Sequence, residues 1–393
     1  MEKIHKNKYT FVATSLFGLE SILAEEISKK GGEDIQIFHR AVSFRGGIAL
    51  LYKMNFSLRT AIRVLWKIKY LRLKSEDDLY DGIKAVPWED YFSLDKTISV
   101  NAVVNSPFFN NSHFVALKVK DAIVDRFRDR TGTRPDVDIE NADVVVNVHI
   151  HQGNVDISLD SSGQPLFKRG YRQGGYLAPL NEVLAAGMIL KTGWDGDSDF
   201  VDPMCGSGTL SIEAAMIAKN IPPGVFRNGF AFQNWHNYDE ELYAKIVENE
   251  MQSREFKYKI LASDISEEAI EVTARNIKGA LLDDVISLEN KDFFETKPES
   301  DSGIVVLNPP YGERISIVRL SEFYSQIGDH LKKSFQGYNA WVLSSNIEGL
   351  KHFGLKPSQK SDLLNGQIKC KYLNYELFRG KRNDFLKKLS ENE

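Results

Sequence analysis

The sequence is poor in cysteine and has no long apolar run, and each shortage excludes a class of protein. Two cysteines among 393 residues cannot form a disulfide framework or a zinc site with four cysteine ligands. No stretch approaches the ~20 apolar residues that span a bilayer. The polar, lysine-bearing start also lacks the apolar core of a signal peptide. We therefore expect a protein of the reducing cytoplasm, with no membrane partner.

Metal-binding patterns and an excess of charge are also missing. The eight histidines show no spacing typical of metal ligands, so we expect no bound metal. Lys and Arg number 50 against 54 Asp and Glu, which gives a formal net charge of −4. This balance argues against a protein whose whole surface attracts nucleic acid.

Basic residues are nevertheless concentrated in three segments. Residues 35–75 contain nine Lys or Arg and no acid, residues 161–181 contain three and no acid, and residues 351–388 contain ten against three acids. Such segments are the electrostatic footprint of a polyanion partner. The alternative is a solvated surface that balances acids elsewhere, and charge alone leaves both interpretations open.

The composition is otherwise globular, with 42% apolar and 26% charged residues, and the length predicts two or three domains. Up to residue 160 the pattern predicts a small α+β region with an antiparallel sheet. Its expected strands lie at 9–13, 68–73, 97–104, 142–150 and 154–160, its helices at 18–30, 58–66, 77–85 and 112–131, and a hairpin joins 42–44 to 48–50 about Gly46-Gly47.

After residue 175, strands and helices alternate at longer spacing. This alternation predicts a doubly wound, mostly parallel α/β sheet, with the domain boundary near residues 165–178. The expected strands lie at 200–201, 260–263, 285–288, 304–307, 340–343 and 372–378, and the helices at 210–218, 266–278 and 320–335.

The first chemical motif runs from Asp202 through Gly206 and Gly208, at the end of a predicted strand and the start of a helix. Glycines there let the backbone approach a ligand, and the helix start offers free N–H groups. The third glycine of the dinucleotide fingerprint is replaced by Ser211, and the Walker lysine is missing. The acid and the turn favour S-adenosylmethionine, although a tight structural turn is the alternative. Cys205 is interpreted as a small packing residue within this turn.

Two further acids follow the next two predicted strands. Asp264 stands where a carboxylate accepts both ribose hydroxyls, although it or Ser266 could simply start the next helix. Asp292 could accept from an adenine amino group while Phe293 packs on the ring. Taken alone, the Asp292-Phe293 pattern is indistinguishable from an acid in a loop.

The most specific motif is Asn308-Pro309-Pro310-Tyr311, which directly follows the apolar strand at 304–307. The prolines restrain the backbone, so that a carbonyl and the Asn308 amide oxygen can converge on an exocyclic amino group. The Tyr311 ring can stack on the base that carries this group. Because the target nitrogen is weakly basic, its positioning must do much of the catalysis.

The Asp202 turn, Asp264 and the Asn308 motif, in this order along the chain, resemble the motifs of class I amino-methyltransferases that act on RNA. The chain is further similar to the THUMP-domain methyltransferases, and within them to the guanine-N2 methyltransferase L group of bacterial large-subunit ribosomal RNA. The segments that carry this closer resemblance are Lys168-Arg169-Gly170-Tyr171-Arg172, Ala178-Pro179-Leu180-Asn181-Glu182 and Asn234-Trp235. Related sequences are often labelled adenine-N6 DNA methylases.

The resemblance implies a Rossmann-like class I methyltransferase domain at 166–393, preceded by a ferredoxin-like region at 1–65 and a THUMP RNA-binding domain at 66–165. Some relatives carry a second methyltransferase domain, which we expect to be absent from a chain that ends at Glu393. The implied S-adenosylmethionine site comprises Asp202, Cys205, Gly206, Gly208, Thr209, Asp264, Ile265, Asp292 and Phe293, and the implied catalytic residues are Asn308, Pro309, Pro310 and Tyr311.

The expected function is methyl transfer from S-adenosylmethionine to guanine N2 of structured RNA, with ribosomal RNA favoured over transfer RNA. Two alternatives stay open: an adenine-N6 methyltransferase acting on DNA or RNA, and an inactive RNA-binding assembly factor. Intact motifs from Asp202 to Tyr311 count against the inactive factor. A basic α+β region favours folded RNA over duplex DNA. The sequence determines neither the exact nucleotide nor the oligomeric state.

Overall fold

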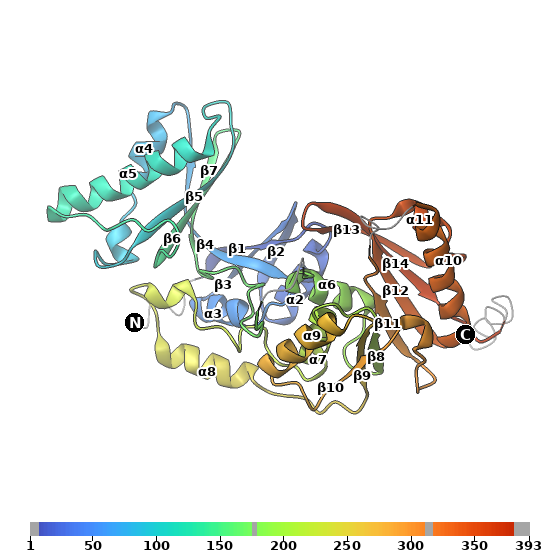
Figure 1. Ribbon diagram of the computed structural model, residues 1–393. Coiled ribbons are helices and arrows are strands. Elements are labelled where there is room, and N and C mark those ends of the chain that lie inside the picture. The colour runs from blue at the N-terminus through green and yellow to red at the C-terminus, as the bar shows by residue number, and fades with distance from the viewer. Residues whose placement is uncertain (1–7, 175–178, 311–316, 381–393) are drawn as a thin grey trace. The chain divides into compact units, whose positions relative to one another are not determined.

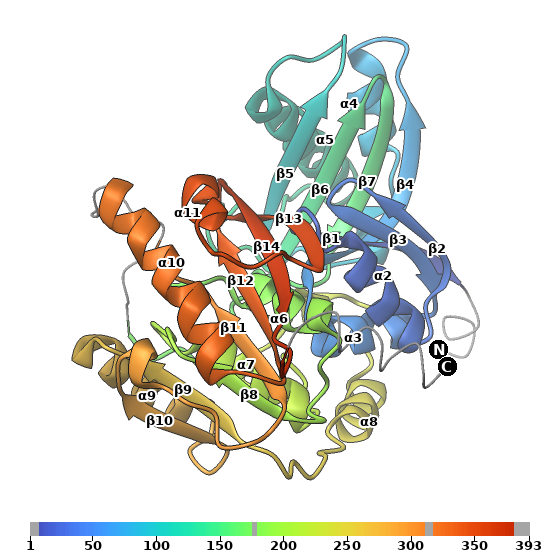
Figure 2. The same cartoon turned by 90° about the vertical axis from the view of Figure 1, so that its right-hand side faces the viewer.

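A computed structural model describes residues 8–174, 179–310 and 317–380. Within these ranges the chain forms two compact units (Figures 1 and 2). The first unit is made of residues 8–15, 23–168 and 227–251, and the second contains the other described residues. The chain passes between the two units at several places, one of them at 168/169, and the domain boundary expected near 165–178 stays a prediction.

One seven-stranded sheet organises the first unit. In spatial order its strands are β2 (Glu33–Phe38), β3 (Ala41–Gly46), β1 (Tyr9–Ser15), β4 (Ala61–Arg72), β7 (Asn154–Asp160), β6 (Val144–His151) and β5 (Ile98–Asn105). The strand β4 is long enough to pair with β1 along its first half and with β7 along its second half. The domain boundary expected at 65/66 therefore falls inside a continuous strand, and the division into three domains stays a prediction.

The β4–β7–β6–β5 half of this sheet has helices on one face. The helices are α4 (Asp77–Lys84) and α5 (Ser112–Thr131), which pack on each other and on the strands (Figure 1); a short 3₁₀ turn, η1 (Trp88–Asp90), follows α4. Helix α5 matches its predicted bounds; Asn111 caps its start and Gly132, with φ of 75°, its end. The pair β5–β6 is parallel, so the sheet is mixed rather than wholly antiparallel.

Two sequence predictions near residue 50 are wrong. The segment Ile48–Ser57 is a helix, α3, and residues 58–66 enter strand β4. The hairpin joins β2 to β3 instead, through a tight turn in which Arg40 has φ of 57°. Almost all of α3 is buried, so its sequence has no polar stripe and carries no helical periodicity. The sequence Gly46-Gly47 therefore predicts a hairpin turn, whereas in the structure Gly47 precedes the first helical residue.

Residues 227–251 follow helix α7 (Thr209–Ala218) of the second unit in the sequence but pack in the first unit. Phe232 is fully buried and stacks on Tyr52 with ring centroids 4.4 Å apart. At the far end, Glu250 pairs with Lys30 at 3.0 Å. The other elements involved are α2 (Glu20–Lys29), η2 (Ala231–Asn234) and α8 (Glu240–Glu250). This insertion is thus part of the N-terminal unit's core.

The second unit is built on another seven-stranded sheet. In spatial order its strands are β10 (Ile286–Asn290), β9 (Ile260–Asp264), β8 (Asp199–Asp202), β11 (Gly303–Leu307), β12 (Tyr338–Ser344), β14 (Ile368–Glu376) and β13 (Gln359–Asn365). The first five strands are parallel to one another, and β14 runs antiparallel to both of its neighbours, β12 and β13. The strand order reverses between β8 and β11, which is where doubly wound sheets bind their ligands.

Helices cover both faces of the second sheet, because the right-handed crossovers on either side of β8 and β11 run in opposite directions. Figure 1 shows α10 on the other side of the strands from α7 and α9. The α10 side chains Leu320, Tyr324, Ile327 and Leu331 recur at helical spacing and are buried on the sheet. The helices are α6 (Glu182–Thr192), α7 (Thr209–Ala218), α9 (Glu267–Gly279), α10 (Ile317–Ser334) and α11 (Ile347–Lys351), with the 3₁₀ turn η3 (Phe293–Glu295).

The sequence pattern predicted the doubly wound sheet of the second unit, and this fold is confirmed. Strand β13 was not predicted; its alternation is weak because it is the exposed edge of the sheet. Within the described ranges, no helix combines the length and apolar character needed to cross a bilayer.

The packing of the insertion leads to a stability prediction. We expect Phe232→Ala to destabilise the first unit by about 3–5 kcal/mol, because a fully buried aromatic ring is removed. Urea titration followed by tryptophan fluorescence measures this, since Trp66, Trp88 and Trp235 all lie in that unit. Phe38→Ala, at a ring that is 53% exposed on β2, is the matched control and should cost less than about 1 kcal/mol. Equal effects of the two substitutions would contradict the assignment.

Candidate active site

The sequence motifs meet at one edge of the second sheet. Asp202 ends β8, Asp264 ends β9, Asp292 follows β10 and Asn308 follows β11. Parallel strands place these positions at the same edge, and β8 and β11 flank the point of strand-order reversal. The fold therefore gathers four segments that lie between Asp202 and Asn308 in the sequence.

The turn after β8 requires its two glycines. Gly206 and Gly208 have φ values of 56° and 75°, in the left-handed region that favours glycine. A Cβ atom on Gly208 would lie 2.6 Å from Cγ2 of Thr273. Both the backbone conformation and the close approach of α9 therefore exclude a side chain at Gly208.

Hydrogen bonds from α9 and β9 hold this turn in place. The Gly206 N–H donates to Oδ2 of Asp264 at 3.0 Å. The Thr273 hydroxyl donates to the Gly206 carbonyl at 2.8 Å, and the Asn276 amide donates to the Ser207 carbonyl at 2.9 Å. The turn is thus fixed before any ligand binds, with the buried Thr209 as the first residue of α7.

Asp202 is the most unusual charged group at this edge. It is fully buried, and its Oδ2 accepts a hydrogen bond from the Ser211 hydroxyl at 2.7 Å. Its Oδ1 is buried without a partner. Burial raises the pKa of Asp202 to about 7, and the nearby charge of Asp264 adds to this effect. A buried acceptor without a donor is suited to a cationic or hydrogen-bonding ligand, which would stabilise the carboxylate.

Asp264 has a different environment. It is half-buried, and its Oδ1 accepts from the N–H of Ser266 at 3.0 Å while Oδ2 accepts from Gly206. Each carboxylate oxygen retains a second lone pair for a ligand hydroxyl. The cap of α9 is Ser266, whose hydroxyl accepts from the Ala269 N–H. The adjacent Ile265 is 70% exposed, so its side chain is available for contact with a ligand.

The segment after β10 shows a capping acid and a buried ring. Oδ1 of Asp292 accepts from the N–H of Phe294 at 3.0 Å, at the start of η3. The Phe293 ring is only 3% exposed and packs against His330 and Phe335, with centroid distances of 4.8 and 6.1 Å. These core contacts leave little of the ring for the expected adenine contact, which stays a prediction.

The segment after β11 continues a fully buried strand. Leu307 is buried, Asn308 is half-buried, Pro309 is buried and Pro310 is exposed. The backbone at this position therefore rises from the core to the surface within three residues. Tyr311 and residues 312–314, which continue the same motif, lie outside the described residues. Ala178, the first residue of the segment 178–182, also lies outside them.

Arg172 is a site residue that the sequence reasoning missed. Its guanidinium donates to Oγ1 of Thr209 and the Leu180 carbonyl, both at 2.9 Å, to Oγ of Ser207 at 3.3 Å, and to Glu182. It thereby ties the glycine turn to the start of α6. The sequence signal was a run of basic residues, which indicated a surface for a polyanion and not an internal anchor.

Cys205 fits the role of a packing residue. Its side chain is 8% exposed and its Sγ lies 3.7 Å from Oγ1 of Thr273. Burial raises the pKa of the Cys205 thiol well above its usual range, which disfavours a nucleophilic thiolate. Within the described residues, no group of His, Cys, Asp and Glu side chains is placed to hold a metal ion.

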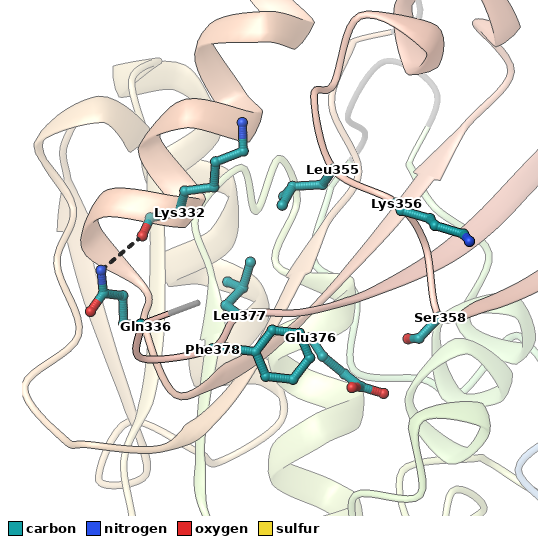
Figure 3. A pocket seen from close by; sticks show the side chains of 9 residues that line it. Lys332, Gln336, Leu355, Lys356, Ser358, Glu376, Leu377 and Phe378 are labelled. Atoms are coloured by element: carbon teal, nitrogen blue, oxygen red, sulfur yellow. Dashed lines mark hydrogen bonds between the residues drawn. The ribbon is translucent and has the colours of Figure 1, made fainter. Parts of the chain in front are cut away.

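A cavity of about 360 Å³ lies at the opposite edge of the same sheet (Figure 3). It is lined by Lys332 near the end of α10, by Gln336 just after that helix, and by residues around the end of β14, such as Glu376 and Phe378. This edge holds the amino ends of the parallel strands, because α10 leads directly into the start of β12. None of the candidate residues lines this cavity, so it is not the site that the motifs form.

Comparison with known families matches three consecutive parts of the chain. Residues 169–374 match the RMKL-like methyltransferase domain, residues 74–160 match the THUMP domain, and residues 10–65 match the RlmL ferredoxin-like domain.

Individual proteins that resemble this chain carry methyltransferase names, in agreement with the family matches. A Synechocystis protein that carries the name of an RNA methyltransferase is 38% identical, over 94% of this chain and 97% of its own length. Ribosomal RNA large subunit methyltransferase K/L of Syntrophotalea carbinolica is 36% identical over 93% of this chain, but the chain spans only 53% of that protein. The solved structure of SMU.472, described as a methyltransferase complexed with SAH, superposes with a TM-score of 0.86 at 28% identity, and the match covers 96% of this chain and all of that one.

The buried carboxyl of Asp202 leads to a prediction about pH. Between pH 4 and 7 the folded protein retains this proton whereas the unfolded chain releases it, so Asp202 lowers stability progressively as the pH rises through that window. We therefore expect the stability of Asp202→Asn, relative to the unsubstituted protein, to increase by up to about 1.4 kcal/mol per pH unit there and to level off above pH 7.

Urea titrations without ligand, from pH 4 to 8, measure this difference. Asp197→Asn, at an exposed acid before β8, is the control. A stability difference for Asp202→Asn that does not change with pH would show that the carboxyl is not protonated in the folded protein.

Proposed function

The chain belongs to the RMKL-like methyltransferases, and we propose that it transfers a methyl group from S-adenosylmethionine to the exocyclic amino group of a base in structured RNA. The observation that carries this proposal is the shared sheet edge. There a buried acid with an unpartnered oxygen, Asp202, lies beside a glycine turn and on the same edge as Asn308 and Pro309.

The described residues fit the cofactor. The unpartnered Oδ1 of Asp202 can accept from the methionyl ammonium group, and the glycine turn leaves space for the backbone to approach the ligand. Asp264 can accept the ribose hydroxyls, and Ile265 can pack on the adenosine. When bound, the cofactor supplies a methyl carbon on positively charged sulfur. SAH, found in the SMU.472 structure, is what remains after that methyl group has left.

Asn308 and the Pro309 carbonyl are proposed to hold the target base. Two acceptors on the amino hydrogens fix the orientation of the nitrogen, whose lone pair is then directed at the methyl group. Tyr311 is proposed to stack on the base. These residues contribute mainly orientation, because the nitrogen that accepts the methyl group becomes a strongly acidic cation, which releases its proton to water without a strong general base.

The charges of the first unit support an RNA partner only in part. Many of the basic residues of 35–75 are paired internally, for example Lys53 with Glu250 and Arg63 with Asp160. The exposed side chains of Lys69 and Arg72, on the second half of β4, and of Lys74, two residues after it, have no ion pair within the described residues. These three cations are the best candidates for phosphate contacts.

The finer assignment is guanine N2 of large-subunit ribosomal RNA. It is supported by the name of the K/L relatives and by the RlmL ferredoxin-like match. The chain spans about half the length of those relatives, so the target of the whole K/L protein is not assigned to this chain. Adenine N6 is the alternative target, because Asn308-Pro309-Pro310 holds either amino group. Ribosomal RNA as the partner and a cytoplasmic setting stay proposals.

One experiment decides between these targets. The protein is incubated with labelled S-adenosylmethionine and total RNA from cells that lack it, and the modified nucleosides are identified by mass spectrometry. We expect labelled N2-methylguanosine. Labelled N6-methyladenosine would overturn the guanine assignment, and a complete absence of label would overturn the enzymatic function.

Asn308→Ala separates base positioning from cofactor binding. We expect methyl transfer to fall by 100-fold or more, on the order of the loss caused by misplacing a reacting group. Binding of S-adenosylmethionine, measured by calorimetry, should stay within about threefold. Asp202→Ala is the contrasting variant and should lose cofactor binding. Unchanged transfer by the Asn308 variant would refute its role.

The free cations of β4 can be tested by the salt dependence of RNA binding. We expect the triple variant Lys69→Gln/Arg72→Gln/Lys74→Gln to reduce the slope of log affinity against log salt by about 2 to 3. The control triple Lys84→Gln/Lys120→Gln/Arg128→Gln changes the net charge equally, at cations already paired with acids. If both triples act alike, β4 has no specific role in binding RNA.

A further inference from the structure

The first unit has a groove of about 540 Å³ on the face of its sheet opposite helices α4 and α5. Most of its lining comes from β5, the residues before β6, the loop after β7 and the insertion, and β4 and β6 contribute Arg63 and Val145. Side chains from these segments include Asn101, Asn141, Gln164 and Asn228. The volume is within the ~300–1,000 Å³ typical of small-molecule sites, which is sufficient for one nucleotide.

The wall of the groove is rigidly built. The Arg227 guanidinium donates to four main-chain carbonyls of the loop after β7, at 2.8 to 3.2 Å; they belong to Ser162, Gln164, Pro165 and Lys168. Gly163 has φ of 72°, and a Cβ there would lie 3.3 Å from the backbone nitrogen of Ala231. The insertion and the loop are therefore held together before any ligand binds.

Three amide side chains of the groove are unengaged. Asn101, Asn141 and Asn228 are exposed, and the described residues provide no hydrogen-bond partner for their side chains. Asn101 is paired in register with Asn147 of β6, whose Nδ2 is buried without a partner. Each amide offers a donor and an acceptor together, which is the pattern that reads the edge of a nucleobase.

The charge of the lining argues against a phosphate site. Among the residues that the structure describes, Arg63 is the only cation that lines the groove, and its Nη1 already donates to Asp160 and the Gly163 carbonyl. Glu140 and Asp143 contribute two acids. Ile139, which is 85% exposed, adds an apolar surface on which a ring can pack. Amides, an apolar side chain and little positive charge favour a base over a phosphate.

We propose that this groove binds one unpaired nucleobase of the RNA substrate, with Asn101 and Asn228 contacting its edge. The inference rests on the proposed RNA function and adds a second contact to it, because the groove lies in the unit that does not contain the candidate active site. The groove would select RNAs that present an unpaired nucleotide, and β4 would contact the phosphates.

The test uses the full-length protein and fluorescein-labelled RNA. The probes are the hexanucleotides rA6, rC6, rG6 and rU6 and a blunt duplex of 16 base pairs, in fluorescence anisotropy titrations. We expect the unsubstituted protein to prefer one hexamer. The double variant Asn101→Ala/Asn228→Ala should lose that preference, with affinity for this hexamer reduced about tenfold or more, while duplex binding is unchanged.

Two further variants make the result specific. Ile139→Glu places a negative charge in the groove at a side chain that is already exposed, and it should reduce hexamer binding similarly without affecting the fold. Asn110→Ala, at an exposed amide outside the groove, should bind as the unsubstituted protein does.

The outcomes distinguish this inference from the proposed function. Equal binding of all four hexamers, or a preference that survives in the groove variants, overturns the inference even when the protein methylates RNA. Loss of the preference in the groove variants supports the inference. If the unsubstituted protein then transfers no label to cellular RNA, the enzymatic function fails while the groove remains an RNA-binding site.

Discussion

The glycine turn after β8 is the constraint on which the candidate active site depends. Its backbone is held from three directions, by the Asp264 carboxylate, the Thr273 hydroxyl and the Asn276 amide. The same bonds place Asp264 at the turn and keep Asp202 beneath it, away from water. The polar groups are thus positioned by the protein itself, which is the condition for a site that acts by orientation.

The buried position of Asp202 lowers the folding stability of the unliganded protein. A buried carboxyl whose second oxygen has no donor destabilises the unliganded protein once it is charged. A cationic ligand that supplies the missing hydrogen bond would remove this penalty, so that folding stability and cofactor affinity are linked. Glu182, a second buried acid in this unit, differs from Asp202 because it is ion-paired with the partly exposed Arg172.

The sequence after α7 is divided between the two units. The insertion leaves the methyltransferase sequence after α7 and contributes aromatic side chains to the core of the N-terminal unit. In the same place it forms one wall of the amide-lined groove. Residues 227–251, which the sequence assigns to the catalytic domain, therefore pack in the unit that is proposed to bind RNA.

The sequence by itself determined the elements with clear periodicity, such as α5, and the order of the motifs at the ends of β8, β9 and β11, because a parallel sheet places strand ends at one edge. Only the tertiary structure decided the features that no local sequence pattern indicates. The helix α3 is buried almost all round and shows no stripe, Phe293 is turned into the core, and Arg172 reaches an internal turn. In each case the deciding neighbours are distant in the chain, so no local pattern could reveal them.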